Sequence, residues 1–178
     1  RAGKAVTMER KHEWGVILAG GDGTRLKSLT RRIIDDERPK QFCPVIGDVT
    51  LVEETQKRVA FELPKERTLF LLNRLHEPYY VNILSDTPTS NLIEPPRNIG
   101  TAPPILYSVL KIAAVDPQAI IGFFPSDHYV SDNTKFMAHI RSAFETAHVG
   151  QDLVILLGIE PESPETEYGW IQPAQAIH

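Results

Sequence analysis

The chain has 178 residues, of which 42% are hydrophobic and 24% charged, and its formal net charge is −4. This composition is typical of a globular domain and excludes a disordered or fibrous chain, and the negative charge argues against a nucleic-acid partner. The single cysteine, Cys43, excludes an internal disulfide, and no apolar run is long enough to span a membrane, so we expect a cytoplasmic protein without a membrane partner.

The first predicted strand, Trp14–Ala19, runs directly into a glycine-rich loop. Residues 1–13 are predicted to be an N-terminal extension, and residues 14–178 to form a single nucleotide-binding domain. Glycine lets backbone N–H groups come close to a bulky anion, which favours a phosphate chain as the ligand. The loop residues expected to bind it are Ala19, Gly20, Gly21 and Gly23.

Side chains near this loop supply further phosphate donors. Thr24 and Arg25 add a hydroxyl group and a bidentate cation, and Lys40 adds a point charge from the motif RPKQF. A Walker A loop would need a lysine directly after its last glycine, and a dinucleotide fingerprint would need a third glycine where Leu26 stands. The sequence therefore predicts a nucleotide site of another kind.

The remaining predicted elements alternate between helices and strands. Thr50 and Glu53 form a capping box, which predicts a helix that runs to about residues 61–63. The later elements are predicted as a strand at Thr68–Leu72, a helix at Glu77–Leu84, a strand at Asn91–Glu94, a helix capped by Thr101, a central parallel strand at Ala119–Phe124, a helix at Asn133–His148 and a fifth strand at Leu153–Leu157. This order predicts an α/β fold with a mostly parallel sheet and helices on both faces.

Ligands of such sheets bind beyond the carboxyl ends of the strands. Asp127 directly follows an apolar strand, where a carboxylate is costly unless it is compensated, so we expect it to be a Mg²⁺ ligand; the alternative is that it caps a turn. Glu94 is either an acceptor for two hydrogen bonds from guanine or a solvated strand end. Gly100 and Thr101 offer close backbone approach and helix N-terminal donors for a nucleotide.

The aromatic pair around Gly169, Tyr168 and Trp170, also has two interpretations. Aromatic ring faces pack on the C–H surfaces of sugars, so the pair can form one wall of a sugar pocket. It can equally belong to a plain edge strand.

Five motifs in a fixed order carry a resemblance to a known family. They are the glycine loop, RPKQF, RNIGTAPPIL at Arg97–Leu106, FPSDH at Phe124–His128 and PETEYGWI at Pro164–Ile171. On these motifs the chain resembles the sugar nucleotidyltransferases, and among them most of all the mannose-1-phosphate guanylyltransferases, or GDP-mannose pyrophosphorylases. The resemblance implies a Rossmann-like nucleotide-diphospho-sugar transferase fold. It also implies a reaction of GTP with mannose 1-phosphate that yields GDP-mannose and pyrophosphate.

The same resemblance assigns roles to individual residues. It implies that Arg25, Lys40 and Asp127 act on the reacting phosphates, with Asp127 helping to hold a Mg²⁺ cofactor. Substrate binding is assigned to Ala19, Gly20, Gly21, Gly23, Thr24, Glu94, Asn98, Gly100, Thr101, Tyr168 and Gly169. GTP and a sugar 1-phosphate are the expected partners, and self-association is a further expectation. Such a reaction needs alignment and charge neutralisation more than a general base.

The chain also departs from the family pattern. Ile99 and Gly100 lengthen the base-contacting loop, and Glu167 stands where the family often has glycine. The chain ends at His178, before the family's Glu-Lys-Pro segment and second metal-binding aspartate, so we expect a truncated domain with weak nucleotide binding and poor turnover. Two alternatives stay open: transfer from dTTP or ATP to glucose 1-phosphate, and a regulatory domain that binds nucleotide without catalysis.

Overall fold

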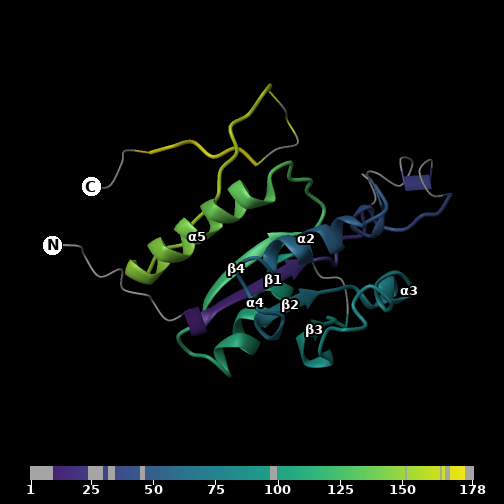
Figure 1. Ribbon diagram of the computed structural model, residues 1–178, viewed down its shortest axis with the longest axis horizontal. Helices are drawn as coiled ribbons and strands as arrows, with labels where there is room; N and C mark the ends of the chain where they lie inside the picture. The colour runs from purple at the N-terminus through teal and green to yellow at the C-terminus, as the bar shows by residue number, and fades with distance from the viewer. Residues whose placement is uncertain are drawn as a thin grey trace.

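A computed structural model describes residues 10–23, 30–31, 35–44, 47–96, 100–150, 152–164, 166 and 169–174. Its centre is a four-stranded parallel sheet (Figure 1). The strands are β1 (Glu13–Leu18), β2 (Thr68–Leu71), β3 (Leu92–Ile93) and β4 (Ile120–Pro125), in the order β3-β2-β1-β4. Leu18 is paired with both Leu71 and Pro125, and Leu71 with Ile93, so the carboxyl ends of all four strands meet at one edge.

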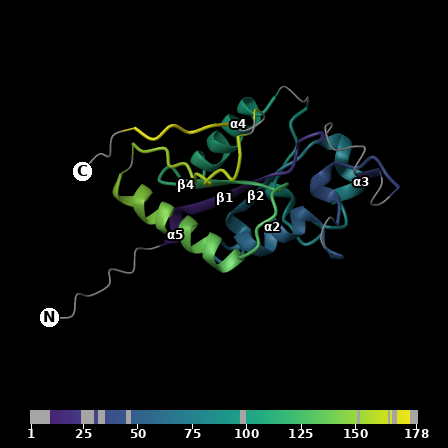
Figure 2. The same ribbon diagram turned by 90° about the horizontal axis from the view of Figure 1, so that it is seen from above.

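Helices cover both faces of this sheet, as predicted. Figure 2 shows α4 on one face and both α2 and α5 on the other. The helices are α2 (Leu51–Val59), α3 (Glu77–Tyr80), α4 (Ala102–Ala113) and α5 (Asn133–Val149), with single 3-10 turns at Arg10–His12, Lys40–Phe42, Lys65–Arg67, Arg74–His76 and Thr89–Asn91. The α/β fold with a parallel sheet is confirmed.

Alternation along the strands divides the core into two layers. Successive strand residues point to opposite faces, so Ile17 packs toward α2 and α5 whereas Val16 packs toward α4. The first layer includes Val52, Val59, Phe70, Phe124, Met137 and Phe144, and the second includes Leu69, Leu71, Ile93 and Ile112. Both layers hold β1 in the middle of the molecule, which fixes the position of the loop that follows it.

The predicted start of α2 is confirmed in detail. The Thr50 hydroxyl accepts a hydrogen bond from the Glu53 amide, and the Glu53 carboxylate accepts one from the Thr50 amide, so the capping box is complete. The helix ends at Val59, earlier than predicted, and turns carry the chain on toward Pro64. Residues 77–84 likewise form a shorter helix than predicted, since α3 ends at Tyr80.

Three expectations about elements are wrong. Leu153–Leu157 forms no strand, and its side chains are exposed, because none of the described strands lies beside it as a partner. For the same reason β4 is an edge strand in the described sheet rather than a central one. Thr101 does not cap α4 with its side chain, since its own backbone is already helical, with φ −82° and ψ −39°.

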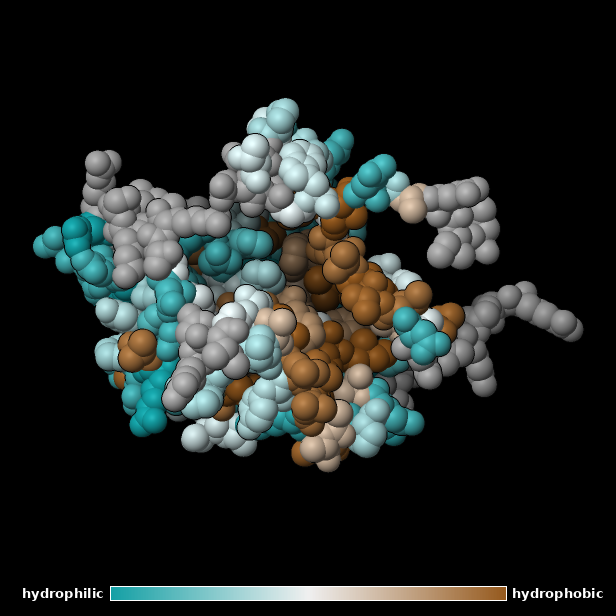
Figure 3. Space-filling view, turned by 180° about the vertical axis from the view of Figure 1, so that it is seen from behind, coloured by the Kyte–Doolittle hydropathy of each residue, from teal (hydrophilic) through white to brown (hydrophobic). Residues whose placement is uncertain are grey.

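The surface over α4 is apolar. Figure 3 shows hydrophobic residues gathered on the face of the molecule that carries this helix, and Leu106, Tyr107 and Leu110 are among its exposed side chains. Within the ranges described above, no helix has the length and apolar character needed to cross a lipid bilayer.

Candidate functional site

The glycine loop and the lysine-bearing segment lie against each other. Gly23 has a φ of +59°, and a Cβ atom there would lie 3.3 Å from the amide nitrogen of Lys40 and 3.4 Å from Cα of Pro39. Gly20 is also confined, because a Cβ atom there would lie 3.3 Å from the carbonyl group of Leu72, directly after β2. Glycine is therefore favoured at Gly23 by its left-handed backbone, whereas a side chain at Gly20 would require the Leu72 carbonyl group to shift by a few tenths of an ångström. The backbone of Lys40 lies beside the loop.

A buried glutamine fastens these two segments together. The Nε2 atom of Gln41 donates hydrogen bonds to the carbonyl oxygens of Ala19 (3.0 Å) and Gly21 (2.8 Å). Phe42 beside it is buried in the core, and the Cys43 thiol donates to the Pro39 carbonyl oxygen at 3.5 Å. Burial raises the pKa of Cys43, and the nearby Arg38 only partly offsets this effect, so the thiol stays protonated and unreactive. Sequence reasoning missed Gln41; the only signal was its position between Lys40 and an aromatic residue.

Asp127 lies at the same edge of the sheet. The buried Ser126 before it donates two hydrogen bonds to the carbonyl oxygen of Leu18, from its hydroxyl group at 2.7 Å and from its amide at 3.3 Å. These bonds join the end of β4 to the end of β1, directly ahead of the glycine loop. The Asp127 carboxylate is about half exposed and lies 3.6 Å from Nε2 of His128.

One carboxylate is compatible with the predicted Mg²⁺ ion. Where the chain is described, no group of three or more His, Cys, Asp or Glu side chains is placed to hold a metal. Mg²⁺ in nucleotide sites commonly takes only one or two protein carboxylates, and phosphate oxygens and water complete its shell. Asp127 therefore fits a metal that arrives with a phosphate chain and does not fit a metal held by protein alone.

The end of β2 supplies the other flank of the loop. Asn73 follows β2 and donates from Nδ2 to Oδ1 of Asp22 at 2.9 Å. Nε2 of the buried His76 lies 3.5 Å from the same oxygen. Asp22 is thus held by residues that follow β2.

Glu94 follows β3 and is exposed, but its carboxylate is already engaged. The Tyr80 hydroxyl donates to Oε1 of Glu94 at 2.6 Å. Burial raises the pKa of Tyr80, and the hydrogen bond to Glu94 acts in the same direction, so Tyr80 remains a neutral donor. This contact leaves the second carboxylate oxygen and the remaining lone pairs for a ligand.

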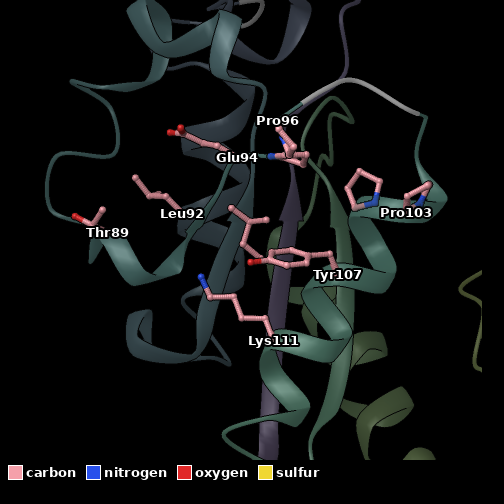
Figure 4. Close-up of a pocket in the computed structure, with 10 residues that line it drawn as sticks. Thr89, Leu92, Glu94, Pro96, Pro103, Tyr107 and Lys111 are labelled. Atoms are coloured by element: carbon pink, nitrogen blue, oxygen red, sulfur yellow. The ribbon is translucent and has the colours of Figure 1, made fainter.

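A cavity of about 560 Å³ opens between β3 and α4. Glu94, Pro96, Pro103, Tyr107 and Lys111 are among its lining residues (Figure 4). Figure 4 shows the Glu94 side chain extending away from Pro103 and Tyr107, so the carboxylate lies at the border of the cavity rather than at its α4 wall.

For some of the other predicted site residues the structure gives only a position along the chain, and several lie outside the described residues. Gly100, with a φ of +89°, and Thr101 directly precede α4, and Gly169 is exposed in a segment without helix or strand. Thr24, Arg25, Asn98 and Tyr168 lie outside the described residues. The structure therefore places the Lys40 backbone beside the glycine loop and Asp127 directly after Ser126, which bonds to the end of β1 ahead of the loop. Glu94 lies at the same edge of the sheet, beyond β2.

Comparisons with known proteins identify a family and several relatives. Residues 14–177 match the family model described as nucleotidyl transferase. The chain is 31% identical over 159 residues to the alginate biosynthesis protein AlgA of Pseudomonas aeruginosa, a match that covers 88% of this chain and 32% of that protein. It is 31% identical over 166 residues to a mannose-1-phosphate guanylyltransferase of Escherichia coli, covering 91% of this chain and 34% of that protein.

A solved structure is also similar. It is the crystal structure of a protein from Thermus thermophilus described as mannose-1-phosphate geranyltransferase, with a TM-score of 0.64 and 31% identity. The match covers 78% of this chain and 39% of that chain. The chain spans about a third of the length of the curated relatives that it matches.

Proposed function

The chain belongs to the nucleotidyl transferase family, and from this membership we propose that it serves to join GTP and mannose 1-phosphate into GDP-mannose, with release of pyrophosphate. The observation that carries the proposal is the gathering of the glycine loop, Lys40 and Asp127 at one edge of the sheet. The mannose-1-phosphate guanylyltransferase of Escherichia coli among its relatives supports the choice of base and sugar.

The proposed reaction is a displacement at the α-phosphorus of the nucleotide. A phosphate oxygen of the sugar phosphate forms a new bond to this phosphorus, and the bond from the α-phosphorus to the oxygen that bridges to the β-phosphate breaks. The electron pair of that bond leaves with pyrophosphate. Because the attacking oxygen is already anionic, the site needs alignment and charge neutralisation rather than a general base.

The chain's own groups divide these tasks. Backbone N–H groups of the loop at Gly20–Gly23 bind the phosphate oxygens, and Arg25 and Lys40 offset their charge. Asp127 is the residue that would hold Mg²⁺, and the ion would neutralise charge shared between neighbouring phosphates. No covalent intermediate with the protein is involved.

Recognition of the base is assigned to Glu94. A carboxylate can accept hydrogen bonds from N1–H and the exocyclic amine of guanine, whereas adenine presents an acceptor at its N1 position. The hydrogen bond from Tyr80 holds the carboxylate in one orientation for this purpose. Gly100 and Thr101 flank the base loop at the start of α4.

The test is a comparison of nucleotides by calorimetry, each in the presence of Mg²⁺. We expect GTP to bind at least about tenfold more tightly than ATP or dTTP, since guanine offers the carboxylate two adjacent donors, whereas adenine and thymine each offer one donor beside an acceptor. Glu94→Gln is expected to remove most of this preference. Pyrophosphate release from GTP, however slow, should require mannose 1-phosphate. Equal affinities, or release with dTTP and glucose 1-phosphate instead, would contradict the proposal.

A further inference from the structure

Gln41 has no role in the proposed displacement at phosphorus, yet its side chain bonds the lysine segment directly to the loop. Resting on the proposed function, we propose that Gln41 is a positioning residue. Its amide group holds the loop in the shape that turns backbone N–H groups toward the triphosphate.

The contacts of Gln41 are specific to the loop backbone. One nitrogen atom donates to two carbonyl oxygens, of Ala19 and Gly21, at 3.0 and 2.8 Å. The side chain is only 4% exposed, so water cannot readily replace these bonds. A glycine loop has little intrinsic preference for one conformation, because glycine has the largest choice of backbone angles. The shape must therefore be set by contacts of this kind.

The direction of the N–H groups follows from peptide geometry. In a trans peptide unit, the carbonyl group of one residue and the N–H group of the next point in opposite directions. The unit of Leu18 and Ala19 illustrates this, since its carbonyl accepts from Ser126, directly after β4, while its N–H donates to Leu71 of β2. The hydrogen bonds from Gln41 fix the carbonyl oxygens of Ala19 and Gly21. The N–H groups of Gly20 and Asp22, which share those peptide units, therefore point away from Gln41.

The same side chain links the loop to the cation. Gln41 is the neighbour of Lys40, and both belong to the 3-10 turn Lys40–Phe42 that Phe42 anchors in the core. The turn Lys40–Phe42 therefore both holds the loop, through Gln41, and places Lys40 beside it. Loss of the Gln41 amide is expected to release the loop while leaving the anchor at Phe42 in place.

The experiment measures binding of inorganic tripolyphosphate with Mg²⁺ to the purified chain. Gln41→Met keeps the approximate shape of the side chain and removes the donor. Asn91→Leu is the matched control, because Asn91 is also buried and its amide donates to the carbonyl oxygens of Lys65, Glu66 and Thr68 at the amino ends of the strands. Each variant loses one buried amide donor and should have a lower melting temperature, but only Gln41→Met should bind tripolyphosphate at least about tenfold more weakly.

If Gln41→Met does not fold, Gln41→Glu takes its place as the test variant, since a protonated carboxyl group can still donate a hydrogen bond to one of the two carbonyl oxygens. The same loss of affinity is expected for this variant. Unchanged affinity in the Gln41 variants would overturn the inference alone, and so would equal losses in these variants and Asn91→Leu. A wild-type chain that does not bind tripolyphosphate would overturn the proposed function together with the inference.

Discussion

At the scale of single residues, contacts that cross long stretches of sequence set the site. Gln41 reaches back to Ala19 and Gly21, and Ser126 reaches back to Leu18. The sequence could predict Lys40 and Asp127, because cations and carboxylates near a glycine loop have an evident chemistry. It could not predict Gln41 and Ser126, since bonds from a neutral side chain to a distant carbonyl leave no pattern in the residues.

Lys40 gives the sharpest test at this scale. Its backbone lies against Gly23, and we propose that its ammonium group offsets charge on the reacting phosphates. We expect Lys40→Ala to lower the rate of pyrophosphate release by a factor of about 10²–10³, the usual effect of removing one preorganised electrostatic donor. Lys65→Ala, at an exposed lysine before β2, should leave the rate unchanged. A normal rate in Lys40→Ala would exclude the lysine from the chemistry.

At the scale of elements, local signals predicted most of the fold. The capping box located α2, and apolar spacing located α5 nearly to its last residue. Leu153–Leu157 has an equally apolar sequence but no described neighbour to pair with, so it forms no strand. Strand formation depends on a partner elsewhere in the molecule, which local sequence cannot supply.

Asp116 connects the segment after α4 to β1, and its ionisation should affect the stability of the protein at acidic pH. It lies after α4 and accepts hydrogen bonds from Trp14 Nε1 of β1 at 2.8 Å and from the Gln118 amide, and His12 Nδ1 lies 2.7 Å away. Burial raises the pKa of Asp116, but the hydrogen bonds with Trp14, His12 and Gln118 together outweigh burial and hold it below its usual value. A depressed carboxyl pKa contributes stability that is complete above the unfolded value, about 3.9, and is lost as the pH falls through the folded value.

We therefore expect Asp116→Asn to cost about 1–2 kcal/mol of unfolding free energy at pH 7, and less as the pH falls below about 4. Denaturant unfolding at several pH values measures both quantities. Asp86→Asn, at an exposed aspartate, is the control and should have little effect at any pH. A cost for Asp116→Asn that is the same at pH 7 and pH 3 would contradict the assigned contacts.

At the scale of the whole molecule, the two ends of the sheet differ in their contributions to ligand binding and to stability. The carboxyl end carries the candidate site, and the amino end carries an ion network around Glu13. Glu13, the last residue of the predicted N-terminal extension, is the first residue of β1 and is only 2% exposed. Arg141 of α5 donates to both of its carboxylate oxygens, at 2.7 and 2.9 Å, and also to Glu62.

This network should govern stability and not nucleotide binding. Burial lowers the pKa of Arg141, but its bonds to Glu13 and Glu62 outweigh burial and raise it overall, so the guanidinium stays charged. We expect Arg141→Met to cost about 3–5 kcal/mol of unfolding free energy, because it removes the guanidinium from the buried Glu13 carboxylate and leaves only His148 Nε2, 3.2 Å from Oε1, beside it. Arg10→Met removes a more exposed partner of Glu62 and should cost less than about 1 kcal/mol. Affinity for GTP measured on folded Arg141→Met should match the wild type, and a loss would show that the two ends are coupled.

We propose that the glycine loop, the Lys40 segment and Asp127 together hold a metal-complexed triphosphate. The most direct test of this proposal is the NMR spectrum of the chain titrated with GTP and Mn²⁺, which broadens the signals of nearby amides. We expect selective broadening at Gly20, Gly21, Gly23 and Asp127, with Asn91 and Gln118 at the amino end of the sheet unaffected. Broadening centred at the amino end, or no selective broadening at saturating GTP, would contradict the account.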